Sequence, residues 1–139
     1  MLTALTRRAA FAAFVFASTL LPAQAREMLV DPEPVAIPAE GVTPDEVAQA
    51  IKAALIGRTW TVEKMAPGRI DAALYIRKHV AHIAITYDAS TIHIAYQSSE
   101  NLDYKEKRGK RYIHDNYLGW IENLVGDIRR HVGNAAFGG

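Results

Sequence analysis

Residues 69–97, RIDAALYIRKHVAHIAITYDASTIHIAYQ, decide the fold of this protein. Apolar residues alternate there with polar or small ones in three runs, at 70–76, 81–87 and 92–97. A period of two is typical of strands that bury one face and expose the other. Short turn-forming stretches at 78–79 and 88–91 separate the runs. The segment therefore predicts three strands of an antiparallel meander.

The expected turns set which residues face each other. A two-residue turn at Lys78-His79 places Leu74 opposite Ile83, and a loop over 88–91 places Ile85 opposite Ile94. The outward side chains then form three cross-strand rows: Tyr75–His82–Gln97, Ala73–Ala84–Ala95 and Asp71–Thr86–His93. Alanines between two polar rows predict a shallow trough for a ligand, a partner strand or a segment of this chain. The alternative is an ordinary solvated sheet face.

A fourth strand is expected over 59–64, before a turn at Pro67-Gly68. A tight turn with regular pairing would expose Trp60 and Val62 and bury Glu63. Because an unpaired buried carboxylate is costly, we favour a longer loop or a β-bulge that returns Trp60 and Val62 to the core.

Helices are expected on both sides of the strands. Thr43-Pro44-Asp45-Glu46 is a capping box with proline at the first helical position, and Gly57 ends that helix. A second helix is expected over 112–132, ending at Gly133 before a flexible tail at 134–139. The pattern predicts a two-layer α+β domain at 43–133: an antiparallel meander of three to four strands, with the N-terminal and C-terminal helices on one face.

The N-terminal 25 residues are typical of a cleaved signal peptide. Arg7 and Arg8 precede an apolar stretch at 9–21, and Ala23-Gln24-Ala25 has the small-x-small pattern of a cleavage site. The stretch is shorter than the roughly 20 residues that span a bilayer. The route is left open between the general and the twin-arginine pathway. Residues 26–42, with three prolines, are expected to be extended, either as a linker or as an arm lying on the domain.

Composition narrows the class of partner. The chain has 16 basic and 15 acidic residues, and Arg7 and Arg8 are the only charges before Arg26, so cleavage changes the net charge from +1 to −1. A near-neutral domain does not favour nucleic acid. The absence of cysteine excludes disulfides and thiol chemistry. We expect a bacterial periplasmic protein.

Catalytic and metal-binding arrangements are not evident from the pattern. His82 and His93 are expected four residues out of register, about 13 Å apart, which is too far to share a metal ion. Asp71 and His93 are expected two strands apart, and the register keeps Ser99 away from His93. No cofactor or metal is expected, and we expect the protein not to be an enzyme.

Two further features are candidates for binding. The basic run 105–111, KEKRGKR, is expected in a loop before the last helix, with Lys107 and Arg108 available to lipid headgroups or acidic partners. Asn101 and Tyr104 are expected to form a rim beside it. The candidate binding residues are Tyr75, His82, Gln97, Asn101, Tyr104, Lys107 and Arg108.

Several motifs together resemble a family of small uncharacterised bacterial envelope proteins, some of them lipoproteins. These motifs are the export signal, the capped helix, Gly57-x-x-Trp60-x-Val62, Pro67-Gly68, the strand pair over 74–87 around His79, Ser99-x-Asn101-Leu102 and Tyr117-x-x-Trp120-x-x-x-Leu124. The resemblance covers residues 43–130, although this chain lacks the lipidation cysteine. It implies location and fold but no activity.

The function expected from these features is a non-catalytic module that binds another envelope component, whether a protein, a lipid headgroup or a glycan. The alternatives are a periplasmic carrier of a small ligand and, least favoured, a small hydrolase.

Overall fold

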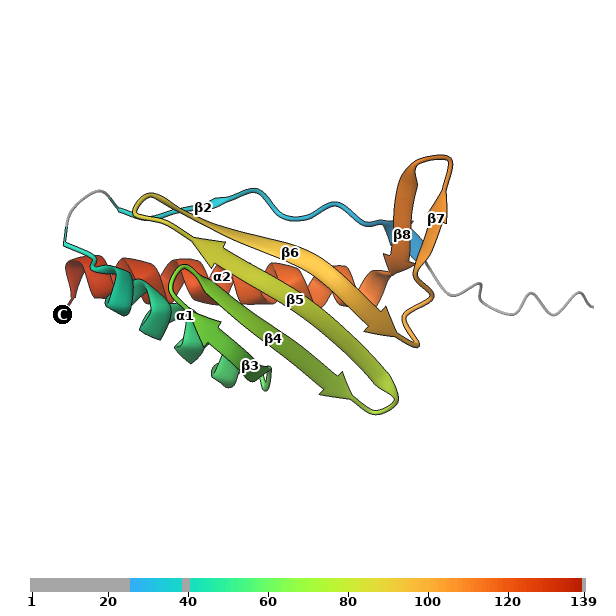
Figure 1. Cartoon of the computed structure of the whole chain (residues 1–139), viewed down its shortest axis with the longest axis horizontal. Helices are drawn as coiled ribbons and strands as arrows, with labels where there is room; N and C mark the ends of the chain where they lie inside the picture. The colour runs from blue at the N-terminus through green and yellow to red at the C-terminus, as the bar shows by residue number, and fades with distance from the viewer. Residues whose placement is uncertain (1–25, 39–40, 139) are drawn as a thin grey trace, which may run out of the picture.

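The computed structural model describes residues 26–38 and 41–138, so the expected signal peptide lies outside the described residues. Two helices and two antiparallel sheets confirm the α+β class (Figure 1). In chain order the elements are β1 (Arg26–Met28), β2 (Val35–Ala36), α1 (Pro44–Gly57), β3 (Thr61–Ala66), β4 (Arg69–Ile76), β5 (His79–Tyr87), β6 (Thr91–Glu100), β7 (Lys105–Lys107), β8 (Lys110–His114) and α2 (Asp115–Phe137).

The larger sheet has the order β2-β6-β5-β4-β3. Its four consecutive strands β3 to β6 form the expected meander, and β2 from the proline-rich arm adds a fifth strand that the sequence pattern did not predict. The residues that face the helices alternate along the strands as expected. They include Ile70, Ala72, Leu74, Ile83, Ile85, Ile92 and Ile94, all at most 3% exposed.

The register of β4 against β5 differs from the prediction by two residues. The turn falls at Arg77-Lys78, so that Leu74 faces Ala81 and Ala72 faces Ile83. The physical reason is tertiary: Arg77 adopts a left-handed backbone (φ 54°), and the turn is held by the Asn101 side-chain amide, which donates a 2.7 Å hydrogen bond to the Lys78 carbonyl. Every side chain keeps its predicted face, but the predicted row of three alanines does not exist. The predicted register of β5 against β6 is confirmed from Ile83 to Tyr87, with Ile85 opposite Ile94, but His82 faces Ser98 and not the predicted Gln97.

Two β-bulges shape the outer face of this sheet. One lies in β3, where Val62 faces Ala72 while Lys64 faces Asp71, and it leaves Glu63 unpaired and exposed. Trp60 is 3% exposed, so the expected bulge is confirmed. The second, unpredicted bulge lies in β6, where the register shifts between His82 and Ile83 and Gln97 is the extra residue.

A second sheet, β1-β8-β7, replaces two predicted features. The basic run is a β-hairpin instead of a loop, and α2 begins at Asp115 instead of at residue 112. The reason is long-range pairing, because β1 supplies the partner strand that holds β8 extended. His114, the last residue of β8, then caps α2 by accepting a hydrogen bond from the amide of Asn116.

The proline-rich arm lies on the domain at both of its ends. β1 pairs with β8 and β2 pairs with β6, while Leu29, Val35 and Ile37 are buried. Between them the Asp31 carboxylate accepts a 3.0 Å hydrogen bond from the Tyr96 amide. The arm therefore joins the two sheets.

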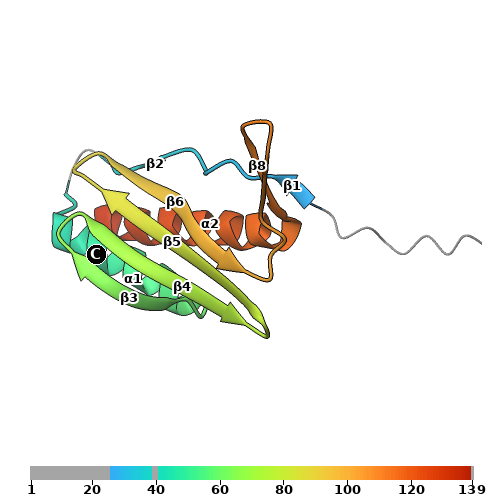
Figure 2. The ribbon, with the colours of Figure 1, turned by 45° about the vertical axis from the view of Figure 1, so that its right-hand side comes forward.

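The helices pack against each other as well as on the inner face of the larger sheet (Figure 2). The capping box of α1 is confirmed by hydrogen bonds between Thr43 and Glu46 in both directions. The second helix continues past Gly133 to Phe137, so the predicted flexible tail is wrong for these residues. The half-buried Ala135 and Ala136 explain why this last turn holds.

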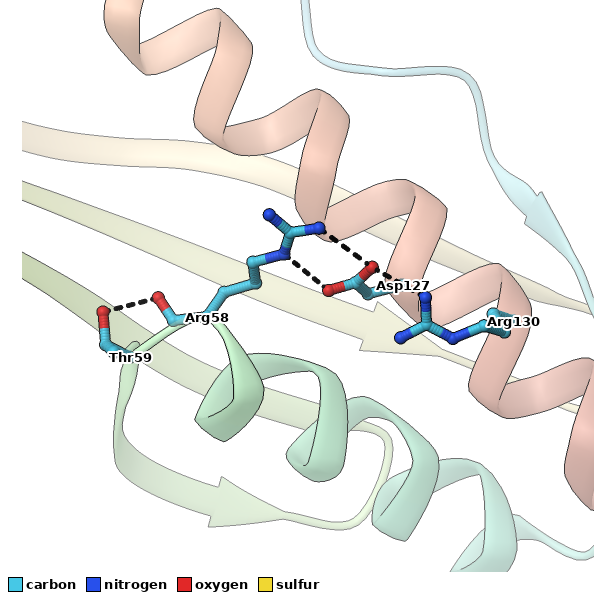
Figure 3. Close-up of polar contacts among 4 residues, drawn as sticks. All are labelled: Arg58, Thr59, Asp127 and Arg130. Atoms are coloured by element: carbon cyan, nitrogen blue, oxygen red, sulfur yellow. Dashed lines mark hydrogen bonds and ion pairs between the residues drawn. The ribbon is translucent and has the colours of Figure 1, made fainter.

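An ion pair joins the two helices where α1 ends (Figure 3). Arg58 Nε lies 2.6 Å from Asp127 Oδ2, and Arg130 Nη1 lies 3.4 Å from Asp127 Oδ1. The Asp127 residue is 8% exposed. The hydrogen bond that the Asp127 carboxylate accepts from the Arg58 guanidinium lowers the pKa of the Asp127 carboxyl.

No helix among the described residues is long and apolar enough to cross a membrane.

Candidate functional site

The three-stranded sheet has one face that carries cations and no acidic residue. Paired residues on neighbouring strands point to the same side, and here Lys105 and Met28 both face Tyr112, while Lys107 faces Lys110. Arg26 lies on the same side, opposite His114. We call this surface the cationic face and define it by the following residues: Arg26, Met28, Lys105, Lys107, Lys110 and Tyr112.

The opposite face of the same sheet holds it against the core. Ile113 is 0% exposed and Leu29 is 3% exposed. Glu27 faces Ile113 and Glu106 faces Arg111, so both acidic residues of these strands lie on this side. The alternation of the strands thus places both acidic residues on the side opposite the cationic face, together with Arg111.

A hollow of about 370 Å³ lies on the cationic face, lined by Arg26, Lys105, Lys107 and Tyr112. Its three cations are exposed, and Tyr112 is half-buried between them. Among the ion pairs of residues 26–38 and 41–138, none involves Arg26, Lys105, Lys107 or Lys110. These positive charges are therefore available to an external anion.

The turn of the hairpin presents two of the predicted binding residues. Arg108 (φ 53°) and Gly109 (φ 75°) both have positive φ, as a two-residue type I′ turn requires. Lys107 and Arg108 are exposed at this tip, which projects from the end of the molecule opposite the C-terminus (Figures 1 and 2).

Tyr104 and Asn101, the expected rim, make contacts within the fold. The Tyr104 ring stacks on Tyr96 at 4.9 Å between centroids, and its hydroxyl donates a 2.7 Å hydrogen bond to Glu106. That hydrogen bond raises the pKa of the Tyr104 phenol. The Asn101 amide donates to the carbonyl of Lys78 at 2.7 Å. Both side chains brace the connections between strands.

Tyr75, His82 and Gln97 lie on the outer face of the larger sheet. Glu63 at the bulge of β3 joins the first two: it accepts a 2.7 Å hydrogen bond from the Tyr75 hydroxyl, and its other oxygen lies 3.5 Å from His82 Nδ1. The bond to Glu63 raises the pKa of the Tyr75 phenol. Ala73, opposite His82, is 0% exposed even though it is on this face, so these side chains close over it.

A hollow of about 290 Å³ borders this cluster, with Glu63, Asp71, His82, Gln97 and Ser98 in its lining. Because the register of β4 against β5 is shifted by two residues, the cross-strand rows differ from the predicted ones: Ala73 faces His82 and Asp71 faces Ala84. Gln97 lies in the bulge and does not share a row with Tyr75.

The outer face brings together residue types used in catalysis. Ser98 faces His82 in the register, and Glu63 contacts His82 from the other side. A nucleophile must lie within hydrogen-bond reach of its base, and the hydrogen bonds of the described residues include none between Ser98 and His82. Within the described ranges, no group of three or more His, Cys, Asp or Glu could hold a metal ion.

Sequence reasoning singled out the basic run 105–111 and, within it, Lys107 and Arg108. It did not name Lys105 and Lys110 as site residues, and it missed Arg26 and Tyr112. The signal was the alternation Lys105-x-Lys107 and Lys110-x-Tyr112 around Arg108-Gly109, which is a hairpin pattern. Glu63 was expected to be exposed, but its contact with His82 was not foreseen, because β4 separates their strands.

Comparisons with protein-family models, with curated proteins and with solved structures found no match.

Proposed function

We propose that this protein is a non-catalytic, exported module of the bacterial envelope that binds another envelope component through the cationic face. The observation that carries the proposal is the set of four exposed cations, Arg26, Lys105, Lys107 and Lys110, on one side of a small sheet whose three strands place no acidic residue on that side. The adjacent Asp115 contacts His114. The signal-peptide pattern and the resemblance to small envelope proteins support the location.

The charges of the two candidate surfaces favour the cationic face. On the outer face of the larger sheet, Arg69 Nε lies 3.0 Å from Asp71 Oδ1, and Glu63 contacts both Tyr75 and His82. Those polar groups already satisfy one another. The cations of the cationic face have no such partner among the described residues. An anionic molecule can therefore form more new charge-assisted hydrogen bonds there.

Site-specific photo-crosslinking in living cells tests the proposal. A photoreactive amino acid replaces Lys107 in the full chain with its export segment, and the matched control carries it at Lys64, an exposed lysine on β3. We expect adducts with a component of the envelope fraction from position 107 and none from position 64. Identical adducts from both positions, or no envelope adduct from position 107, would show that this face is not the binding surface.

A further inference from the structure

The arrangement of charges on the cationic face suggests what kind of component it meets. We infer that this face docks on the surface of an anionic phospholipid bilayer, an inference that rests on the proposed function. The cations are spread over three adjacent strands, about 4.8 Å apart, and recur at about 6.8 Å along a strand. A spread array of single charges suits a plane of phosphate groups, since each lysine can meet a different headgroup.

The centre of the face has the amphipathic side chains that a headgroup layer accommodates. Met28 and Tyr112 face each other in the register, and Met28 is 45% exposed. Tyrosine combines an apolar ring with a polar tip and is enriched at membrane interfaces. Lysine stems can lie along apolar surface while their ammonium groups reach phosphates. The face thus pairs an apolar centre with a cationic rim.

The expected cleavage of the N-terminal segment adds to the charge that an anionic membrane would meet. The apolar stretch 9–21 is joined to the domain through Arg26, the first residue of β1 and a member of the cationic face. If the segment is cleaved after Ala25, the new α-amino group adds a cation beside Arg26. The expected processed N-terminus therefore adds positive charge to the cationic face.

Vesicle co-sedimentation tests the inference with the processed protein purified from the envelope of expressing cells. Lipid vesicles contain phosphatidylglycerol mixed with phosphatidylcholine, or phosphatidylcholine alone. We expect binding to the anionic vesicles only. Raising the salt from about 0.05 M to about 0.5 M should weaken this binding, because the Debye length, about 10 Å at about 0.1 M, shortens and exposed charges are screened. Equal binding to both vesicle types would overturn the electrostatic mechanism.

Paired variants locate the binding surface. Each cation near an anionic surface contributes about fivefold in partitioning, so K105Q/K107Q should bind about 25-fold more weakly. The matched control K64Q/K78Q removes the same net charge from other exposed positions and should bind within about twofold of the wild type. Thermal unfolding of both variants confirms that each is folded. Equal losses in the two pairs would contradict docking through this face.

The two proposals fail in different ways. If the protein does not bind anionic vesicles but position 107 still crosslinks to an envelope protein or glycan, the lipid inference is wrong and the proposed function stands. If position 107 captures no envelope component at all, phospholipid included, the proposed function fails with it. Crosslinks from position 107 to phospholipid, together with a selective loss in K105Q/K107Q, support both.

Discussion

Replacing Ile113 by alanine should destabilise the protein, because it weakens the packing of the three-stranded sheet against the core. Ile113 is the inward residue of β8, is 0% exposed and belongs to the same buried cluster as Leu29, Leu102 and Tyr117. The substitution removes three carbon groups, worth about 2.4 kcal/mol at about 0.8 kcal/mol each. The cavity left behind adds to this, so we expect a loss of about 3 kcal/mol, within the range of about 2–5 kcal/mol for such changes.

Urea unfolding measures this loss directly. The midpoint should fall while the slope with denaturant stays constant, because the surface exposed on unfolding hardly changes. The matched control is Val30→Ala in the neighbouring arm, since Val30 is 66% exposed. It should change the free energy of unfolding by less than about 0.5 kcal/mol. If Ile113→Ala lowers the free energy of unfolding by less than about 1 kcal/mol, or by no more than Val30→Ala does, then β8 does not pack on the core as described.

Two further predictions concern the ion pair and one turn. The fold lowers the pKa of the Asp127 carboxyl. The contribution of Asp127 to the free energy of unfolding is therefore complete above the ordinary carboxyl pKa of about 3.9 and is lost as pH falls through the lowered value. Urea unfolding should therefore show Asp127→Asn less stable than the wild type at pH 7, with a smaller difference at pH 3; a difference that grows with acid would contradict the pairing. Gly68→Ala should lower the free energy of unfolding by more than about 1 kcal/mol, because φ is +74° and the added Cβ would lie 3.2 Å from the Tyr87 carbonyl oxygen. The control is Gly57→Ala, where the added Cβ meets open space, and it should be neutral or stabilising. Thermal unfolding of both variants measures the difference.

Much of the larger sheet could be predicted because one physical constraint dominates it. Burying one face requires alternation, which identified the inward residues Ile70, Leu74, Ile83 and Ile94. The same period of two explains the error in register. A slip by one residue turns a strand inside out, but a slip by two leaves every side chain on its face. Alternation could therefore not separate a turn at Lys78-His79 from the observed one at Arg77-Lys78.

Tertiary contacts hold that turn in place. The Asn101 amide donates to the Lys78 carbonyl, and His79 Nδ1 lies 2.6 Å from the Asn101 carbonyl oxygen. Neither turn position is a glycine or asparagine, the residues that favour positive φ locally. The information that sets the turn thus lies more than twenty residues away, where no local pattern can reveal it.

The candidate site was predicted only in part for the same reason. The charge of Lys107 and Arg108 is visible in the run 105–111, but charged residues are poor evidence for a strand. The strand β8 forms because β1 pairs with it from the far end of the chain, and only then do Arg26 and Tyr112 join the lysines on one face. A basic loop and a proline-rich arm, read separately, do not indicate a common surface.

The arm is consequently part of the proposed binding surface as well as of the fold. It contributes β1, with Arg26 and Met28, to the smaller sheet and β2 to the larger one. Its Asp31 contacts the Arg111 guanidinium at 3.5 Å and accepts the Tyr96 amide, so one carboxylate links β8 to β6. The cationic face is therefore attached to the core by contacts of two kinds, the buried Ile113 and Leu29 and the polar Asp31. Since Asp31 is about one-third exposed, solvent screens its ion pair with Arg111, and the polar attachment is the weaker of the two.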